Sequence, residues 1–406
     1  MLKYAFAGAG NRGIEMYAVP MAERYGHCAE LVGVYDINHK RANLLRQRTN
    51  KDFPVYAGFA QMLDQAKPDV VIITTVDRYH HEYAIRAMEA GCDVIIEKPM
   101  TIDADKCNAI LETEKRTGRH AVVTFNYRFS PFASRLKELL MDGIIGDIYS
   151  VHFEWLLDTR HGADYFRRWH RRKENSGGLL VHKATHHFDL VNWLLEEDPV
   201  VVHALGSRRF YGPTRAQRGE RCLTCSFQES CEYYMDIRLG ENRDLYFACE
   251  DVDGYFRDGC VFSEAIDIED TMSLNVRYSG GAMMSYSLTA HSPYEGYRLS
   301  LNGSNGRFEA EDLHGGIGPF AGQQIYKIRV YNRKNEEISF RIPAAEGMHG
   351  GGDERLMKIL MEGSTADPLG RLADTRAGAM SIMIGIAANE SIRLGQSVRI
   401  SDLLKS

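Results

Sequence analysis

A glycine-rich turn near the N-terminus constrains the fold more than any other feature of the chain. The β-type run at residues 3–7 leads into GAGNRG at residues 8–13, and a stretch rich in Met, Ala and Glu follows. A strand, a tight glycine turn and a helix in this order let the backbone approach a pyrophosphate closely, because unpaired amides and the positive end of the helix dipole meet there. One GxGxxG motif is weak support by itself. The residues expected to form this dinucleotide-binding turn are Gly8, Gly10, Asn11, Arg12 and Gly13.

An aspartate downstream strengthens the same prediction. The apolar run at residues 31–35 ends in Asp36, about twenty residues beyond the turn, where a carboxylate can accept both hydroxyls of an adenosine ribose. Asp36 would repel the 2′-phosphate of NADP, although His39, Lys40 and Arg41 just downstream could attract one. We therefore expect NAD rather than NADP as the cofactor.

The alternation of strands and helices continues beyond Asp36. Residues 69–74 and 93–96 read as buried parallel strands, with a helix from about residue 81 to 90 between them. Repeated units of this kind imply a doubly wound parallel sheet, whose ligands collect at the carboxyl ends of the strands. A lysine at such an end can donate a proton to a carbonyl oxygen or hold an oxyanion. By position alone, however, Lys98 reads more readily as a surface residue.

Length and composition indicate a soluble chain of two domains. A chain of 406 residues is too long for one hydrophobic core. It contains 44% hydrophobic residues but no apolar run of the roughly 18 residues that a membrane span needs. The N-terminus lacks the features of a secretion signal, so we expect a cytoplasmic protein. A net charge of −6 without a basic block argues against nucleic acid as a partner and favours small molecules or other proteins.

Alternating strands replace the strand–helix units from about residue 126. Four segments read as half-buried strands of a meander-like sheet: residues 147–155, 271–278, 282–288 and 297–302. A short helix at residues 134–141 would connect the two regions.

A cysteine-rich excursion interrupts this second region between about residues 207 and 269. Three close thiols and a distant fourth can build a structural zinc site, and an iron–sulfur cluster uses the same type of ligand. The candidate ligands are Cys222, Cys225, Cys231 and Cys260, with Cys249 as an alternative. Because there is only one C-x-x-C pair, reduced structural cysteines are an equally good interpretation.

The stretch VHKATHHFD at residues 181–189 contains three imidazoles, an ammonium and a carboxylate. If one helix runs from Gly177-Gly178 to about residue 196, one stripe of it would consist of His182, His186, Asp189 and Trp193. A metal-binding helix of the HExxH type would have a glutamate between the two histidines, where this chain has Lys183 and Thr185. We therefore do not expect a metal site on this helix, and Trp193 indicates that this stripe is covered.

Together these features resemble the glucose-fructose oxidoreductase, inositol dehydrogenase and rhizopine-catabolism (Gfo/Idh/MocA) family. The matching segments are GAGNRG, Asp36, residues 74–99 ending in EKP, FNYRFSP at 125–131, SGGLL followed by HKATHHFDLVNWLL at 182–195, and residues 375–398. The resemblance implies a Rossmann domain at residues 1–124. It also implies an α+β domain at residues 125–406, with a large open, mostly antiparallel sheet that forms homo-oligomers (dimers or tetramers) and a last helix at about residues 374–394.

The resemblance also implies a nicotinamide cofactor and its contacts. Gly8, Gly10, Gly13 and Asp36 would hold it, and the residues near its nicotinamide half would be Thr75, Asp77, His80, Glu97 and Lys98. Asp77 departs from the family pattern, because many relatives have asparagine there. Lys98 becomes a much stronger catalytic candidate than its position alone allows.

The family pattern has, on the equivalent helix, an aspartate and then, four residues later, a histidine beside the substrate. When Asp189 and Trp193 are aligned with the family pattern, the histidine of the pattern falls at His186. The aspartate of the pattern falls at His182. His186 could act as a base toward a sugar hydroxyl, and Asp189 could orient its ring. The sequence does not decide whether His186 or His182 takes the proton.

Further residues are candidates for contact with a sugar, because aromatic planes and forked donors suit its apolar face and hydroxyl rim. They are Tyr127, Arg128, Trp155, Arg168, Trp169 and Lys183. The segment from His349 to Asp353 opens a predicted helix and could reach the same pocket, or it could be a flexible loop with an N-cap at Asp353.

The residues and the resemblance together imply an NAD-dependent dehydrogenase of a sugar, cyclitol or glycoside, in which Lys98 and His186 transfer the hydroxyl proton. The alternative is a glycosidase or lyase that keeps NAD bound and uses transient oxidation to eliminate a glycosidic bond. A regulatory or scaffold protein that binds NAD fits less well, because it would not need the Lys98 and His186 pairing.

Overall fold

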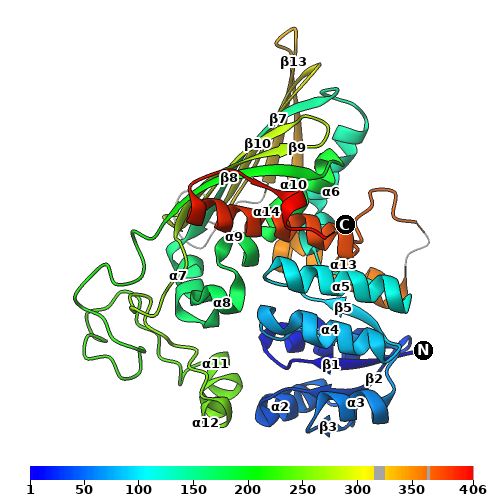
Figure 1. Cartoon of the computed structure of the whole chain (residues 1–406), viewed down its shortest axis with the longest axis vertical. Helices are drawn as coiled ribbons and strands as arrows, with labels where there is room; N and C mark the ends of the chain where they lie inside the picture. The colour runs from blue at the N-terminus through cyan, green and yellow to red at the C-terminus, as the bar shows by residue number, and fades with distance from the viewer. Residues whose placement is uncertain (315–324, 364–365, 406) are drawn as a thin grey trace.

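Two sheets organise the chain in this computed structural model, which describes residues 1–314, 325–363 and 366–405. The first sheet has six parallel strands in the order β3-β2-β1-β4-β5-β6. The second has nine strands in the order β14-β13-β12-β11-β7-β10-β9-β8-β15. In Figure 1 the first sheet lies at the lower end of the molecule and the second rises above it. The predicted fold class is confirmed.

The first sheet and its helices follow the strand–helix alternation that the sequence predicts. Its strands are β1 (Leu2–Ala7), β2 (Ala29–Tyr35), β3 (Val55–Tyr56), β4 (Val70–Ile73), β5 (Asp93–Ile96) and β6 (Ala121–Val123). Its helices are η1 (Gly13–Ala18), α1 (Val19–Arg24), α2 (His39–Thr49), α3 (Phe59–Ala66), η2 (Asp77–Tyr79), α4 (His80–Glu89) and α5 (Ala104–Thr117). β4 is buried along its whole length, as expected for a parallel strand covered on both faces.

Close packing explains two glycines of the turn after β1. Gly8 has φ +100°, and a Cβ there would lie 2.7 Å from the carbonyl carbon of Thr74. A Cβ at Gly13 would lie 2.6 Å from the Thr74 hydroxyl oxygen, which donates a 2.9 Å hydrogen bond to the Gly8 carbonyl. The glycines therefore allow the turn to pack against the end of β4. The helix that follows begins as the π-helix η1 and continues as α1.

The second sheet is mostly antiparallel, as predicted, and among its described strands only β10 and β7 run parallel to each other. Its strands are β7 (Ile148–Asp158), β8 (Pro199–Ser207), β9 (Thr271–Tyr278), β10 (Met283–Ser292), β11 (Glu295–Gly303), β12 (Gly306–His314), β13 (Ile325–Asn332), β14 (Glu337–Pro343) and β15 (Val398–Arg399). Burial alternates residue by residue along β9 and β10, so one face is covered and the other exposed.

Helices fill the space between the covered face and the first sheet. They are η3 (Asn126–Phe129), α6 (Pro131–Met141), α7 (Thr159–Arg167), η4 (Trp169–Arg171), α8 (Lys173–Ser176), α9 (Leu179–His182), α10 (Thr185–Leu195), η6 (Met348–Gly351), α13 (Gly352–Glu362), α14 (Thr375–Leu394) and η7 (Ile400–Asp402). The long helix α14 packs against α10 and β8. Among the helices of the described ranges, none is both long and apolar enough to cross a membrane.

The single helix predicted from Gly177-Gly178 to about residue 196 is wrong in one respect. Lys183 and Ala184 separate the short helix α9 from α10. The covered second stripe is confirmed, because His182, His186, Asp189 and Trp193 are all buried. Lys183, which lies in this break, is buried.

The cysteine-rich excursion leaves the second sheet between β8 and β9. It contains three short helical segments, α11 (Glu241–Leu245), η5 (Phe247–Cys249) and α12 (Glu250–Asp253). Figure 1 shows α11 and α12 beside α2 of the first sheet, far from the nine-stranded sheet. The excursion therefore reaches back to the N-terminal part of the molecule.

The predicted metal site in this excursion is not formed. Within the described ranges, no group of three or more His, Cys, Asp or Glu side chains is arranged to hold a metal ion. The sulfur of Cys222 accepts a hydrogen bond from Arg167, that of Cys225 from the amide of Phe227, and that of Cys231 from Arg215. Cys260 is a buried free thiol. Guanidinium groups beside two of the four thiols would repel a metal cation.

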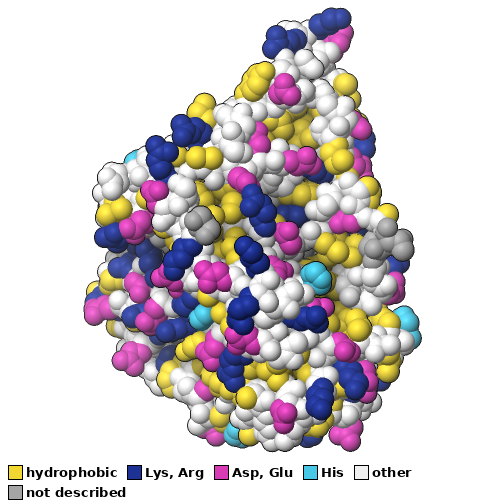
Figure 2. All heavy atoms as spheres, turned by 45° about the vertical axis from the view of Figure 1, so that its right-hand side comes forward, with side chains coloured by type: hydrophobic (Ala, Val, Ile, Leu, Met, Phe, Trp, Pro, Cys, Tyr) yellow, Lys and Arg dark blue, Asp and Glu magenta, His cyan; other side chains and the backbone are white. Residues whose placement is uncertain are grey.

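Figure 2 shows Lys and Arg side chains interspersed with Asp and Glu side chains across the face that it presents. The charges drawn on this face do not gather by sign, in agreement with the lack of a basic block in the sequence.

Candidate active site

Three polar side chains form a chain of contacts where the two sheets meet. Asp77 follows β4, Lys98 follows β5, and His182 ends α9. The Asp77 carboxylate lies 2.5 Å from Nδ1 of His182, and Nε2 of the same ring lies 3.5 Å from Nζ of Lys98. Nζ also donates to the His182 carbonyl at 3.3 Å. The neutral tautomer with its proton on Nδ1 satisfies both ring contacts.

Burial controls the ionisation of this chain. It lowers the pKa of Lys98 to about 8, while the Asp77 and Glu97 carboxylates act against the shift. Burial likewise raises the pKa of Asp77, opposed first by the Lys98 ammonium. Burial and then the Lys98 charge hold the pKa of His182 well below its usual value. The imidazole is therefore neutral at pH 7 and lies between two groups that stabilise each other's charge.

His186 lies in the same buried region with a free ring nitrogen. Its Nδ1 is buried and has no hydrogen-bond partner among the described residues, and the ring packs edge-on against Tyr127 at 5.4 Å between centroids. Burial, followed by the charge of Lys98, holds the pKa of His186 well below its usual value. His186 is thus a neutral imidazole that can accept a proton, whereas both ring nitrogens of His182 are engaged.

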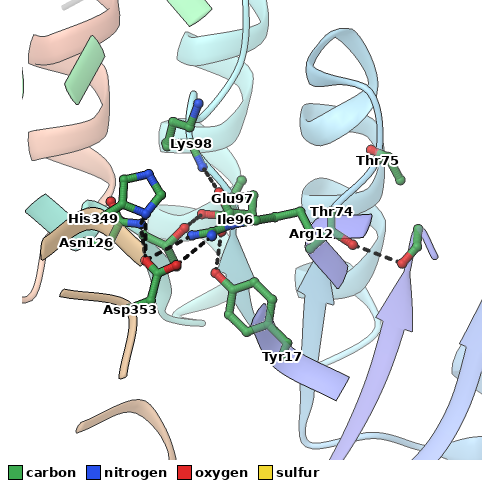
Figure 3. Close-up of polar contacts among 12 residues, drawn as sticks. Arg12, Tyr17, Thr74, Thr75, Ile96, Glu97, Lys98, Asn126, His349 and Asp353 are labelled. Carbon is green, nitrogen blue, oxygen red and sulfur yellow. Dashed lines mark hydrogen bonds and ion pairs between the residues drawn. The ribbon is translucent and has the colours of Figure 1, made fainter. Parts of the chain in front are cut away.

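A second polar cluster ties Glu97 to the C-terminal part of the chain. Figure 3 shows Arg12 between Glu97 and Asp353, with the Lys98 side chain pointing away from the cluster. Glu97 Oε1 accepts hydrogen bonds from Arg12 at 2.8 Å and from the Tyr17 hydroxyl at 2.6 Å, and Arg12 also donates to Asp353 at 2.8 Å. Although burial alone would raise the pKa of Glu97, Arg12 and Tyr17 lower it. Glu97 is therefore a fixed anion beside Lys98.

This cluster decides between the two interpretations of the segment from His349 to Asp353. Asp353 lies in the first turn of α13 and does not cap it, because its carboxylate binds Arg12, Asn126 and His349. The His349 ring lies 5.6 Å from that of His186. The segment therefore reaches the pocket, as one of the two interpretations predicted, and the N-cap interpretation is wrong.

Asp189 does not orient His186, contrary to the prediction. Its carboxylate accepts two hydrogen bonds from Arg128, at 2.8 and 2.6 Å, and both side chains are at most 6% exposed. A bidentate ion pair this deeply buried occupies both partners. Arg128, predicted to contact substrate, is thereby held in the protein interior.

Of the other predicted pocket residues, Trp169 contacts His182, whereas Trp155 and Arg168 have different partners. Trp155 is buried, stacks on His187 at 3.8 Å between centroids, and lies beneath the ammonium of Lys183 at 5.0 Å. Trp169 is half-buried and its ring meets that of His182 edge-on at 5.8 Å. Arg168 pairs with Asp164 at 2.7 Å. Lys183 and Trp169 thus remain side chains that a bound molecule could contact.

The glycine turn and Asp36 fit a dinucleotide. A Cβ at Gly10 would meet no heavy atom within 4 Å, so space is open above the turn. The Asp36 carboxylate accepts from the amides of Ala9 and Asn38, each at 2.7 Å, which leaves acceptor positions for ribose hydroxyls. These residues could hold the adenosine and pyrophosphate of a nicotinamide cofactor.

Two predicted cofactor neighbours have other contacts. The His80 ring nitrogens lie 2.8 Å from the Pro99 carbonyl and 3.1 Å from the Thr75 carbonyl, so His80 joins the ends of β4 and β5. The Thr75 hydroxyl lies 3.4 Å from the carbonyl of Val76. His80 therefore links the two strand ends, whereas the long contact of the Thr75 hydroxyl leaves that group able to turn toward a bound cofactor.

His170 is a pocket residue that the sequence analysis missed. Its ring stacks on Trp169 at 3.6 Å and lies 4.1 Å from that of His182, and its Nδ1 is buried without a partner among the described residues. The motif that drew attention began at residue 181, and nothing in the local sequence distinguishes His170 from a surface histidine.

Family models match nearly the whole chain. Residues 2–125 match the NAD-binding Rossmann fold of the oxidoreductase family GFO_IDH_MocA, and residues 137–400 match the C-terminal alpha/beta domain of the same family. The chain belongs to this family of oxidoreductases.

Individual relatives agree with this assignment. A Bacillus subtilis protein that is named as an oxidoreductase, YteT, is 37% identical to this chain over an alignment of 437 residues. The alignment covers 100% of this chain and 99% of YteT. The D-glucoside 3-dehydrogenase of Escherichia coli is 28% identical over 194 residues, which cover 48% of this chain and 54% of that enzyme.

Solved structures share the fold. An oxidoreductase domain protein from Kribbella flavida aligns with a TM-score of 0.70 at 18% identity, covering 98% of this chain and 99% of that one. The aldose-aldose oxidoreductase from Caulobacter crescentus, complexed with glycerol, aligns with a TM-score of 0.64 at 18% identity, covering 98% of this chain and 99% of that one.

Proposed function

We propose that this protein is an NAD-dependent dehydrogenase that oxidises a CH–OH group of a sugar, cyclitol or glycoside. The observation that supports it most is the chain of Asp77, His182 and Lys98 beside the neutral His186, at the strand ends where ligands of such sheets bind. The substrate class is supported by two relatives named D-glucoside 3-dehydrogenase and inositol 2-dehydrogenase/D-chiro-inositol 3-dehydrogenase.

The proton and the substrate oxygen are handled by different residues in this proposal. His186 accepts the proton of the substrate hydroxyl: its ring nitrogen is free, and its lowered pKa keeps the imidazole neutral, so that a lone pair is available. The Lys98 ammonium donates a hydrogen bond to the oxygen as it becomes a carbonyl. His182 and Asp77 position Lys98 and stabilise its charge. A bound nicotinamide would supply the hydride acceptor.

The position of Lys98 predicts how oxidation depends on pH. Because Lys98 acts as an ammonium and its pKa is about 8, we expect kcat/KM to fall above about pH 8 as the proton is lost. The Asp77 carboxylate raises the pKa of Lys98, so Asp77→Asn should move this decline to lower pH. Measuring kcat/KM from pH 6 to 10 for both proteins checks the sign. A decline at higher pH in the variant would contradict the assignment.

The function itself is tested by a substrate panel. The purified protein is incubated with NAD and a set of sugars, cyclitols and glycosides, and absorbance of reduced nicotinamide is followed. We expect stoichiometric NADH with at least one member. Release of an aglycone without net NADH would instead favour elimination, and no turnover by a protein that binds NAD would contradict the proposal.

A further inference from the structure

The cysteine-rich excursion docks on the segment that follows Asp36. The Asn38 side chain donates to the carbonyl of Cys249 at 2.8 Å. The Lys40 ammonium donates to the Ala248 carbonyl at 3.2 Å. These contacts join positions more than 200 residues apart in the chain, and Figure 1 shows α12 beside α2. The excursion therefore forms one wall of the space around the Asp36 carboxylate.

Two carboxylates of α12 pair with the two cations next to Asp36. Asp251 lies 2.7 Å from the ammonium of Lys40, and Asp253 forms an ion pair with Arg41. Arg41 also faces Asp36, with 3.7 Å between Nε and Oδ1. Lys40 and Arg41 are the cations that could attract a 2′-phosphate, and in this structure both are neutralised by carboxylates from a distant segment.

The two pairs differ in strength because they differ in exposure. The Arg41 and Asp253 side chains are 9% and 10% exposed, whereas those of Lys40 and Asp251 are 42% and 68% exposed. Water and salt screen the exposed pair, but a pair this buried keeps most of its attraction. Asp253 is therefore the residue that matters more for the charge of Arg41.

We propose that Asp253, assisted by Asp251, makes this site select NAD over NADP. The inference rests on the proposed function, in which Asp36 faces the adenosine ribose. A 2′-phosphate beside Asp36 would meet three carboxylates against the two cations Lys40 and Arg41. If Asp253 were neutral, the guanidinium of Arg41 could turn its donors toward the phosphate in the bidentate geometry that arginine favours.

The test measures binding, independently of turnover. Dissociation constants for NAD and NADP are determined by calorimetry on the full-length protein, and their ratio is compared among variants. Asp253→Asn should lower the ratio of the NADP constant to the NAD constant by about tenfold or more, the change expected from one charge-assisted contact. Asp251→Asn should lower it by about threefold or less, because that pair is exposed.

Two controls separate the pairing from a general charge effect. Asp236→Asn removes the same charge from the excursion at a residue that pairs with Arg238 of the same segment, and it should leave the ratio unchanged. Adding Arg41→Ala to Asp253→Asn should abolish the gain in NADP affinity. If Asp253→Asn fails to fold, Asp253→Ser takes its place, because it removes the same charge from beside Arg41 and should lower the ratio to a similar extent.

The outcomes distinguish this inference from the proposed function. If the wild-type protein binds neither dinucleotide, the proposed function fails. If it binds NAD preferentially and the ratio is the same in Asp253→Asn, or in Asp253→Ser when Asp253→Asn does not fold, the selectivity inference is overturned and the proposed function stands. A wild-type preference for NADP would also overturn the inference.

Discussion

Replacing Lys98 by methionine is expected to lower kcat/KM for alcohol oxidation by about 10³- to 10⁴-fold. The loss corresponds to about 4–5.5 kcal/mol of transition-state stabilisation. Methionine keeps the length of the side chain and removes only the ammonium, which is the group that contacts His182 and faces the reacting oxygen in the proposed mechanism. The substitution also takes from Asp77 the opposite charge that stabilises its carboxylate, so thermal unfolding of the variant is measured alongside its kinetics. The dissociation constant for NAD should stay within about threefold of the wild-type value.

Lys106→Met is the matched control for this variant. Lys106 lies on α5 and pairs with Asp103 three residues earlier, so its substitution removes a lysine outside the pocket. We expect its kcat/KM to equal that of the wild type. Steady-state kinetics with NAD and an active polyol measure both variants, and a Lys98→Met enzyme within tenfold of the wild type would rule out the catalytic role of Lys98.

His186→Asn should lower kcat/KM by about 10²- to 10⁴-fold, because asparagine cannot accept the hydroxyl proton. The effect should appear in kcat, with KM and NAD affinity nearly unchanged, since the ring is expected to act on the proton in the transition state. The free Nδ1 of His186 is the observation on which this expectation depends.

His182→Asn provides the comparison that assigns the proton acceptor. His182 acts through Lys98 in this account, so its replacement should shift the alkaline decline of kcat/KM and cost less activity than His186→Asn. Full pH profiles of the two variants are needed. If His182→Asn is the more damaging variant and His186→Asn keeps a wild-type profile, the two histidines have been assigned in the wrong order.

Much of the fold follows from patterns that are local in the sequence. The glycine turn, the apolar strand and Asp36 predict the dinucleotide end of the first sheet, because backbone sterics and charge determine which residues fit there. Alternation of polar and apolar residues likewise predicts β9, whose observed bounds are the predicted residues 271–278. These features can be predicted without knowing which distant segments of the chain contact each other.

The break between α9 and α10 could not be predicted in the same way. The hydrophobic period continues across Lys183 and Ala184, and helix propensity alone does not end a helix there. The close packing of α14 on α9 is likewise a contact between distant segments: a Cβ at Gly385 would lie 2.2 Å from the Leu180 carbonyl oxygen.

The sequence predicted which residues belong to the candidate site better than it predicted which of them contact one another. Lys98, His182 and His186 do lie together, but the carboxylate that serves His182 is Asp77, which is 105 residues away. On sequence alone His182 falls at an aspartate position of the family pattern, and in the structure the carboxylate beside His182 is that of Asp77, which follows β4. The docking of Asp253 on Arg41 is a similar contact between distant segments.

The most direct test of the central claim follows the hydrogen that leaves the substrate carbon. A polyol that turns over in the panel is supplied with deuterium on its carbons, and the reduced nicotinamide is isolated and its mass measured. We predict one deuterium in each reduced cofactor, in an amount equal to the substrate oxidised. Reduced cofactor without deuterium, or oxidised product without reduced cofactor, would contradict hydride transfer from a CH–OH carbon to NAD.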